Sequence, residues 1–239
     1  MTINLNGPSD REFRWSIDVA DRLDPGRVCE EVADVLKQCD HGAIQLWIHE
    51  VDPLTHMALV ECGWNQYRDL WQLTRSLPTS SAEIHTRAFT RDDIDDLVSV
   101  NNRAFSWHPE QSGLTAADVE KSMKEPWFDS DGIRLLHIEG RLAGFCWTKV
   151  HAGTVLPNTD HPRTDRRVGE IYVIAIDPDF HGRGLGAPMT LAGLDWLADQ
   201  GIVTGMLYVE SDNAAANAVY RRLGFAHHHT DRAYRRVLP

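Results

Sequence analysis

The sequence has no long apolar run and no recognisable export signal. Across its 239 residues, no stretch approaches the roughly 18 uninterrupted apolar residues of a membrane-spanning helix. The opening residues, MTINLNGPSDREF, contain neither a basic n-region nor the apolar segment of a secretory signal. A hydrophobic fraction of 42% and a charged fraction of 25% are typical of soluble globular proteins. We therefore expect a soluble, cytoplasmic protein that does not bind membranes.

Cysteine is scarce and follows no motif. Cys29, Cys39, Cys62 and Cys146 form no CxxC pair, and no histidine stands near them at metal-ligand spacing. This pattern predicts that all four cysteines are reduced and structural. We also expect Cys146, which lies in the middle of a predicted strand, to be a core residue and not a covalent nucleophile.

Basic residues are outnumbered by acidic ones. The chain has 24 Lys and Arg against 35 Asp and Glu, so its net charge is -11. Nucleic acid needs a basic face, so we expect no nucleic-acid partner, whereas an acidic surface suits a cationic amine substrate. The run from His227 to His229 suggests a metal site, but neighbours in a strand point to opposite faces and cannot converge on one ion. We therefore predict no metal.

Periodicity and turn residues divide the chain into two parts. The first part is predicted to contain a helix over residues 26–39, a strand over 43–50, a helix over 53–64 and a strand over 67–77. The small and polar stretch 78–82, PTSSA, is typical of a linker. The sequence thus predicts a smaller region over residues 1–77, a linker over 78–82 and a complete domain over 83–239.

The second part alternates strands and helices. We expect a strand over 84–89, helices over 92–104 and from 116, and two strands joined by a tight turn at Glu139-Gly140. A strand over 169–177, a helix over 184–198, a strand over 204–211, a helix over 214–223 and a final strand follow. Helical crossovers imply parallel strands, while the hairpin implies antiparallel ones. The predicted fold class is therefore α/β, with a mixed central sheet flanked by helices.

The most informative segment joins the strand at 169–177 to the next helix through Gly182, Gly184 and Gly186. Glycine lets the backbone approach an anion closely, and the amides of a helix N-terminus point their positive ends at it. Taken alone, this turn also fits a generic tight connection. It lacks the Lys-Ser/Thr of a P-loop and the GxGxxG of a dinucleotide site.

Two motifs together resemble the GNAT superfamily of acyl-CoA-dependent N-acyltransferases. The run HGRGLG, from His181 to Gly186, is similar to the family's pyrophosphate loop, Arg/Gln-x-x-Gly-x-Gly/Ala, with histidine replacing the usual first residue. Further on, the segment NAVYRRLGF contains Tyr220, and Asn213 lies in the turn before it. Both residues are in register with the family's second motif. The resemblance covers residues from about 83 to the C-terminus. It implies the GNAT fold and acetyl-CoA as co-substrate.

The resemblance also implies which residues hold acetyl-CoA. Backbone amides around Ile174 and Ile176 would hold the thioester carbonyl and the pantetheine arm, and the glycine loop would hold the pyrophosphate. The complete implied set is Ile174, Ala175, Ile176, His181, Gly182, Arg183, Gly184, Leu185, Gly186, Ala187, Asn213, Ala214, Ala215, Ala216, Asn217 and Ala218.

Amide formation needs a free amine and a proton for the departing thiolate. By its place in the family pattern, Glu170 is the candidate general base; a solvated carboxylate at a strand end is the alternative. Tyr220 is the candidate general acid, and a helix tyrosine packed on the core is its alternative. The resemblance favours the catalytic interpretation of both residues.

Stretches outside the shared motifs resemble the mycothiol synthase family, actinobacterial GNAT enzymes that acetylate the cysteinyl amine of a glucosaminyl-inositol conjugate. They are VNNRAFSWHPEQSG, EPWFDSDGI, GFCWTKVH, GEIYV and LYVESDNAAA. This resemblance implies that Glu110, Lys149, Glu170 and Tyr208 face the acceptor, and that the amine attacks acetyl-CoA directly in a ternary complex. From the residues alone, Lys149 equally fits a solvated strand-end lysine, and Glu110 a capping or loop carboxylate.

Mycothiol synthases consist of two GNAT halves, so residues 1–77 were compared with the second part as a repeat. Aligning CGW at 62–64 with LGF at 223–225 matches a strand and a helix, and places Leu59 where the second part has Tyr220. No glycine-rich loop precedes this unit. The comparison predicts a truncated, degenerate GNAT-like repeat with a structural role.

Two other functions stay open at this point. One keeps the fold and changes the acceptor to another small amine, such as an aminoglycoside, a polyamine or an amino acid. The other is a non-catalytic acyl-CoA-binding module, which the presence of both Glu170 and Tyr220 disfavours. We expect a monomer or a weak homodimer.

Overall fold

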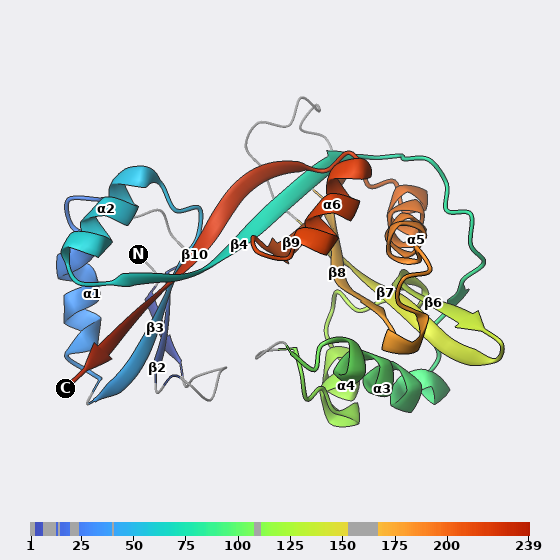
Figure 1. The fold of residues 1–239 in the computed structure, drawn as a ribbon, viewed down its shortest axis with the longest axis horizontal. Coiled ribbons are helices and arrows are strands. Elements are labelled where there is room, and N and C mark those ends of the chain that lie inside the picture. Colours follow the sequence, from blue (N-terminus) through green and yellow to red (C-terminus); the bar gives the residue numbers. More distant parts are fainter. Residues whose placement is uncertain are drawn as a thin grey trace. The chain divides into compact units, whose positions relative to one another are not determined.

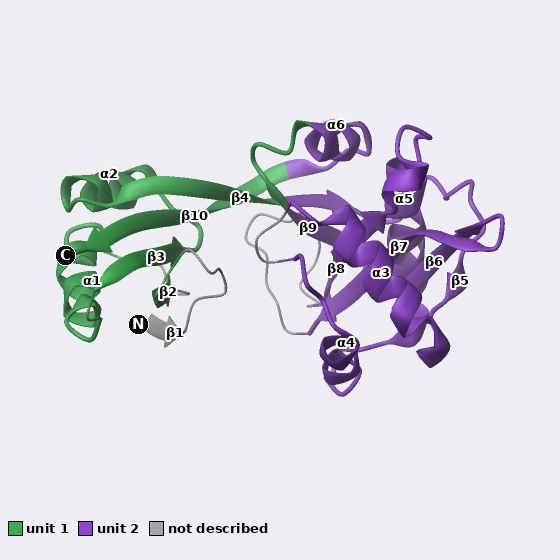
Figure 2. Cartoon of the chain, turned by 60° about the horizontal axis from the view of Figure 1, so that its bottom comes forward, with its two compact units in different colours: residues 1–72, 209–214, 227–239 green, residues 73–208, 215–226 purple. Residues whose placement is uncertain are grey.

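The computed structural model describes residues 3–6, 13, 15–19, 24–39, 41–107, 111–152 and 167–239. The chain forms two compact units (Figure 2). Unit 1 comprises Met1–Gln72, Val209–Ala214 and His227–Pro239, and unit 2 comprises Leu73–Tyr208 and Ala215–Ala226. Unit 1 thus includes two C-terminal segments that the sequence-based division places in the second domain. The linker over residues 78–82, and a catalytic domain that begins after it, stay predictions.

Unit 2 contains the mixed sheet that the sequence predicts. Its strands lie in the order β9-β8-β7-β6-β5. β8 (Val168–Ile176) is parallel to β9 (Thr204–Glu210) and antiparallel to β7 (Arg141–His151), and β6 (Ile133–Ile138) pairs antiparallel with both β7 and β5 (Arg87–Ala88). The helices of this unit that the structure describes are α3 (Ile94–Ala104), α4 (Ala116–Ser122), α5 (Gly186–Asp199) and α6 (Ala214–Arg222), which Figure 1 labels. Short 3₁₀ turns occupy Arg91–Asp93, Ser130–Gly132 and Pro178–Phe180.

Helices α3 and α5 cover opposite faces of β7 and β8. Cys146 faces α5, because a Cβ added at Gly193 of that helix would collide with the Cys146 Sγ atom. Its neighbours Phe145 and Trp147 belong to the buried cluster that contains Leu97 of α3. Successive side chains of a strand point to opposite faces, so the α3 face and the α5 face of this sheet are distinct.

The hairpin turn between β6 and β7 lies where the sequence places it. Glu139 and Gly140 have φ angles of 52° and 77°, both in the left-handed region that a type I′ hairpin turn requires. The predicted antiparallel hairpin is confirmed. Its register brings β7 beside β8, which carries the candidate base.

The strand predicted over residues 84–89 is shorter in the structure. Only Arg87 and Ala88 pair with β6, opposite Leu135 and Arg134. The Thr86 carbonyl instead accepts a hydrogen bond of 2.9 Å from the Arg134 guanidinium.

Unit 1 has strands in the order β1-β2-β3-β10-β4 and two helices. β1 (Ile3–Asn6) pairs antiparallel with β2 (Trp15–Val19), β2 lies parallel to β3 (Gly42–Ile48), and β3 is antiparallel to β10 (Ala226–Leu238). β4 is Asn65–Ser76, and the helices are α1 (Val28–Leu36) and α2 (Pro53–Glu61). The Asp52 carboxylate caps α2 by accepting from the amides of Leu54 and Thr55. The buried core includes Ile17, Leu46, Leu59, Trp64 and Tyr234.

The prediction that all four cysteines are reduced is wrong for two of them. Cys29 of α1 and Cys62, directly after α2, form a disulfide with their Cα atoms 6.2 Å apart. They are separated by 33 positions in the sequence, and the packing of the two helices brings them together. Cys39 and Cys146 are buried thiols, as expected of structural cysteines.

Helices α2 and α6 end in the same backbone geometry. Each is followed by a glycine with positive φ, 84° at Gly63 and 79° at Gly224. The next amide donates to the carbonyl five residues earlier, over 3.0 Å in both cases: Trp64 to Leu59 and Phe225 to Tyr220. This correspondence follows the alignment from which a repeat was predicted. The repeat itself stays a prediction.

Candidate active site

Helix α5 begins at an open glycine loop. Gly182 and Gly184 have φ angles of 76° and 74°, and a Cβ added at either position or at Gly186 would meet no atom within 4 Å. Among the described residues, no side chain caps the helix at Leu185, and its first turn contains no acidic residue. The first amides of α5 are therefore available to an anion, which the helix dipole also attracts.

His181, the residue that departs from the family pattern, ties this loop to β8. Its Nε2 atom lies 2.9 Å from the carbonyl oxygen of Ile176. A carbonyl only accepts, so the ring N–H is the donor. His181 thus anchors the start of the loop to β8 through its side chain.

The pairing between β8 and β9 is short. It consists of three residue pairs and ends at Ile171 and Leu207, although both strands continue. On the other side of β8, the amide of Asp177 donates to β7. Because amides along a strand alternate in direction, those of Ile174 and Ile176 point away from β7. They therefore line the side of β8 that β9 leaves unpaired, which is where the family resemblance places the thioester.

A β-bulge interrupts β8 at Tyr172. The register passes from Trp147 opposite Val173 to Thr148 opposite Ile171, so Tyr172 has no counterpart on β7. Bulges re-aim side chains and end pairing, and they are frequent beside active sites. Burial, and secondly the charge of Glu170, raise the pKa of the Tyr172 hydroxyl.

Glu170 is buried on β8, and a histidine holds its carboxylate. The residue is 7% exposed, and its Oε2 atom lies 2.7 Å from Nε2 of His151 at the end of β7. An unpaired charge of this kind would be costly to bury, so the histidine contact explains how a carboxylate is tolerated here. The solvated strand-end alternative for Glu170 does not describe this environment.

Lys149 lies opposite Glu170 in the β7–β8 register. Its Nζ atom sits over two aromatic rings, 4.6 Å from the centroid of Trp127 and 5.2 Å from that of Tyr172. Rings attract a cation through their negative faces, and this contact is stronger when water is partly excluded. The Lys149 ammonium is therefore fixed by aromatic contacts beside the candidate base. The alternative, a freely solvated lysine at a strand end, does not describe this environment.

Tyr220 of α6 is buried, and its ring packs edge-on against Phe225 with centroids 5.7 Å apart. Burial raises the pKa of the Tyr220 hydroxyl, so the group stays protonated at neutral pH and can donate. Burial also raises the pKa of the Cys146 thiol to about 12, which removes the thiolate that covalent catalysis needs.

The candidate base and acid come from different elements of unit 2. Glu170 shares the α3 face of the sheet with its register partner Lys149, whereas Tyr220 lies on α6. The outward amides of Ile174 and Ile176 belong to β8, the strand that also carries Glu170.

The remaining predicted residues lie on β9 and at the start of α6. Tyr208 lies on β9 with its side chain 37% exposed. Asn213 directly precedes α6, and its amide donates to the carbonyl of Glu210. In the compact-unit division, Asn213 and Ala214 belong to unit 1, whereas the other described site residues belong to unit 2. The first turn of α6 carries only small side chains, with Ala214 and Ala215 exposed.

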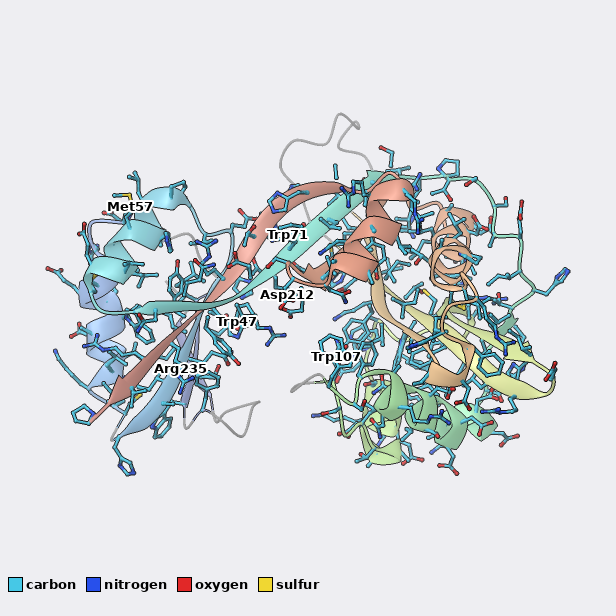
Figure 3. The ribbon with its side chains drawn as sticks, in the orientation of Figure 1. Trp47, Met57, Trp71, Trp107, Asp212 and Arg235 are labelled. Atoms are coloured by element: carbon cyan, nitrogen blue, oxygen red, sulfur yellow. A yellow bond between two sulfur atoms is a disulfide. The ribbon has the colours of Figure 1, made fainter. Side chains whose placement is uncertain are left out.

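A cavity of about 410 Å³ lies on the α3 face of unit 2. The sheet side of the cavity is formed by Phe145, Trp147, Tyr172 and Val173. Helices α3 and α4 and the segment between them contribute Asn101, Gln111, Ser112, Gly113, Leu114, Asp118 and Ser122. Glu110, predicted to face the acceptor, is outside the described residues. Trp107, which precedes it, projects from the end of the α3 segment with its side chain 62% exposed (Figure 3).

Sequence reasoning missed three residues next to the predicted ones: Trp127, His151 and Tyr172. All three lie in the stretches EPWFDSDGI, GFCWTKVH and GEIYV. The resemblance therefore identified the segments but not these three residues within them. Period-2 alternation could have found His151, because it places Lys149 and His151 on one face of β7. The contact of Trp127 with Lys149 depends on the loop after α4 and has no local signal.

The described residues fit acetyl-CoA. The uncapped start of α5 offers amides to the pyrophosphate, the absence of Cβ atoms in the glycine loop leaves room for it, and the unpaired side of β8 offers N–H groups to the amide-rich arm. No group of three His, Cys, Asp or Glu residues that could hold a metal ion occurs in the part of the chain that the structure describes. Within the same part, every helix is too short or too polar to cross a membrane.

Comparison with known proteins identifies similar chains. The model of the acetyltransferase (GNAT) family matches residues 94–225, more than half of the chain. The mycothiol acetyltransferase of Amycolatopsis mediterranei is 40% identical over 215 residues, which cover 85% of this chain and 70% of that protein. The enzyme of the same name from Rhodococcus erythropolis is 47% identical over 150 residues, 62% of this chain and 48% of its own length. The chain thus spans between about half and about two thirds of the length of these relatives.

Solved structures agree on the fold. The GCN5-related N-acetyltransferase of Sphaerobacter thermophilus aligns with 99% of this chain and 76% of its own, with a TM-score of 0.74 and 17% sequence identity. This similarity concerns the fold alone. It confirms the predicted fold class, a mixed sheet flanked by helices.

Proposed function

Because the chain belongs to the acetyltransferase (GNAT) family, we propose that it acetylates the cysteinyl amine of cysteinyl-glucosaminyl-inositol (desacetylmycothiol) to give mycothiol. The observation that carries this proposal is the sequence similarity, over most of the chain, to enzymes named mycothiol acetyltransferase. The amine attacks acetyl-CoA directly in a ternary complex. Catalysis resides in residues 83–239, and residues 1–77 form a truncated repeat with a structural role.

Acetyl-CoA supplies an acetyl group activated as a thioester. The proposed contacts to its pyrophosphate are the amides of residues 181–187 at the start of α5, with residues 213–218 at the start of α6 contributing a small-residue surface. The amides of Ile174 and Ile176 donate to the thioester carbonyl and the pantetheine arm. Such fixed donors stabilise the negative charge that develops on the carbonyl oxygen during attack.

Glu170 and Tyr220 divide the proton transfers between them. Glu170 takes a proton from the acceptor ammonium, directly or through water, and the amine then attacks the thioester carbon. When the carbon–sulfur bond breaks, Tyr220 donates its hydroxyl proton to the departing sulfur, and the second proton of the attacking nitrogen leaves to water. The raised pKa of Tyr220 suits this role, because the group arrives protonated.

The acceptor is proposed to bind on the α3 face, beside Glu170. Lys149 and Tyr208 contact its hydroxyl groups, and Glu110 contributes from the loop after α3. The cavity beside Tyr172 carries serine, asparagine and aspartate side chains, which suit a polyol. Beyond the site, we propose a cytoplasmic monomer or weak homodimer that needs no metal and binds neither nucleic acid nor membranes.

The test is acetyl transfer measured by mass detection of product, with cysteinyl-glucosaminyl-inositol beside aminoglycosides, polyamines and amino acids. Mass detection is needed because the acceptor's own thiol interferes with assays of released CoA. Efficient acetylation of this acceptor alone supports the proposal. Reaction of another amine alone would replace the substrate and keep the enzyme class, and silence across the panel would favour an acyl-CoA-binding module.

A further inference from the structure

We propose that His151 is a positioning residue for Glu170: its Nε2–H group orients the carboxylate so that Oε1 faces the acceptor amine. This inference rests on the proposed function, since it assigns Glu170 the role of base. It adds a residue that the two family motifs do not contain. The contact that carries it is the 2.7 Å distance between His151 Nε2 and Glu170 Oε2.

The direction of this hydrogen bond follows from the chemistry of its partners. An ionised carboxylate has only acceptors, so Nε2 must carry the proton. In the described part of the chain, the histidine is the one side chain within hydrogen-bond distance of this carboxylate, and it contacts a single oxygen. Oε1 is left to take a proton from the substrate.

Burial makes a hydrogen-bond partner necessary for this carboxylate. The Glu170 side chain is only 9% exposed, and the His151 side chain that contacts it is 26% exposed. Burying a charged group without a hydrogen-bond partner is costly, so the contact with His151 offsets the loss of water at Glu170. The same directional bond fixes the orientation of the carboxylate.

The Lys149 ammonium on the same face has aromatic contacts. Lys149 lies opposite Glu170 in register, but its ammonium contacts the rings of Trp127 and Tyr172. A direct ammonium pair would hold a full positive charge against the carboxylate and reduce its basicity. An imidazole N–H fixes the same carboxylate through one directional bond. The aromatic contacts and the histidine therefore serve the same end, an oriented base.

The test compares glutamine and asparagine at position 151, because the two side chains place their amide nitrogens at different distances from the backbone. The side-chain nitrogen of glutamine can occupy the place of Nε2, whereas asparagine reaches only the place of Nδ1. We expect His151→Asn to lower kcat by about 10- to 100-fold, the loss expected when a reacting group is displaced by about 1 Å, with the KM for acetyl-CoA unchanged. His151→Gln should retain most of the activity. His85→Asn, an exposed histidine of unit 2 outside the site, is the matched control.

Coupling to Glu170 separates positioning from general structure. In a Glu170→Gln background, His151→Asn should cost nothing further, because its effect acts through the carboxylate. Equal losses in the glutamine and asparagine variants, or losses that add to that of Glu170→Gln, would overturn the proposal. The acceptor in this test is whichever amine the wild-type protein acetylates, so a change of substrate does not affect it.

A second measurement does not need turnover. With ¹⁵N-labelled histidine, the His151 Nε2 resonance should show a protonated nitrogen and should shift in Glu170→Gln, while the His85 resonances stay in place. An unprotonated Nε2 or an unmoved signal would contradict the contact even if no amine were acetylated. Failure of the proposed function and failure of this inference are thus distinguishable.

Discussion

Lys149 and Glu170 stand opposite each other across β7 and β8, yet the Lys149 ammonium lies 4.6 Å from the ring centroid of Trp127. A lysine and a glutamate in register on one face would ordinarily form an ion pair. Here aromatic rings hold the cation, and His151 holds the anion. The result is a buried carboxylate with one of its oxygens held by a histidine.

Replacing Glu170 with glutamine should lower kcat by about 10²-fold or more, because the amide cannot accept the proton of the acceptor ammonium. Affinity for acetyl-CoA, measured by calorimetry, should stay the same, since the α5 loop is untouched. Glu83→Gln, at an exposed carboxylate, serves as the control. An unchanged rate in Glu170→Gln would remove this residue from the mechanism.

Replacing Tyr220 with phenylalanine should slow the reaction without loosening the fold. The edge-on packing against Phe225 involves the ring and survives the change, so the thermal midpoint should stay within a few degrees of wild type. The lost hydroxyl removes the proposed proton donor, and kcat should fall by about 10²-fold if thiolate departure limits the rate. Single-turnover kinetics, which separate chemistry from product release, check this, and full activity would argue for a packing tyrosine.

Gly184→Ala should weaken acetyl-CoA binding. Its φ of 74° is costly for alanine, by about 1 to 2 kcal/mol, and the added methyl group would also stand where the backbone approaches the pyrophosphate. Gly201→Ala is a matched control, because Gly201 has a φ of 76° but lies after the opposite end of α5. Both variants should lose similar stability in urea, and only Gly184→Ala should raise the Kd for acetyl-CoA. An equal loss of acetyl-CoA affinity in both variants would show that backbone strain, and not contact with the pyrophosphate, causes the effect.

The Cys29–Cys62 disulfide should stabilise unit 1. A cross-link that closes a loop of this length removes denatured-state entropy worth about 3 to 4 kcal/mol. Urea unfolding of the wild-type protein should therefore move to lower midpoints when dithiothreitol is added. The Cys29→Ala/Cys62→Ala double variant should have the same urea midpoint as the reduced wild-type protein, and dithiothreitol should not change that midpoint. A wild-type curve that reductant leaves unmoved would show that the thiols are free in solution.

Stability should depend on pH through His49 of unit 1. Hydrogen bonds to Asp18, at 3.1 Å, and to Asp231, at 2.8 Å, raise the pKa of His49 from 6.5 to about 10. The folded pKa lies above the unfolded one, so the imidazolium stabilises the fold fully below pH 6.5 and less and less as the pH rises toward 10. The difference in unfolding free energy between wild type and His49→Gln should be largest at pH 6 and shrink by pH 10. A constant difference across that range would contradict the linkage.

Much of the candidate site follows from local sequence signals. The open start of α5 follows from glycines that accept positive φ, and the turn at Glu139-Gly140 follows from the needs of a type I′ hairpin. Glu170 and Tyr220 were found because the family motifs place them at fixed distances from these features. Such signals act within a few residues, so periodicity and turn chemistry are enough to find them.

Other features depend on which segments meet in space. The sequence pattern predicts four reduced cysteines, but the packing of α1 against α2 brings Cys29 and Cys62 to bonding distance. The contact between His151 and Glu170 depends on the β7–β8 register, which a bulge at Tyr172 shifts. A one-residue slip of that register would turn these side chains to opposite faces.

The sequence by itself therefore determined the family, the cofactor loop and the identity of the candidate base and acid, since motif spacing and backbone conformation are local properties. Only the tertiary structure decided how the base is held. Strand register, the bulge and the loop that carries Trp127 are set by burial across the whole sheet, and they give His151 to Glu170 and the aromatic rings to Lys149.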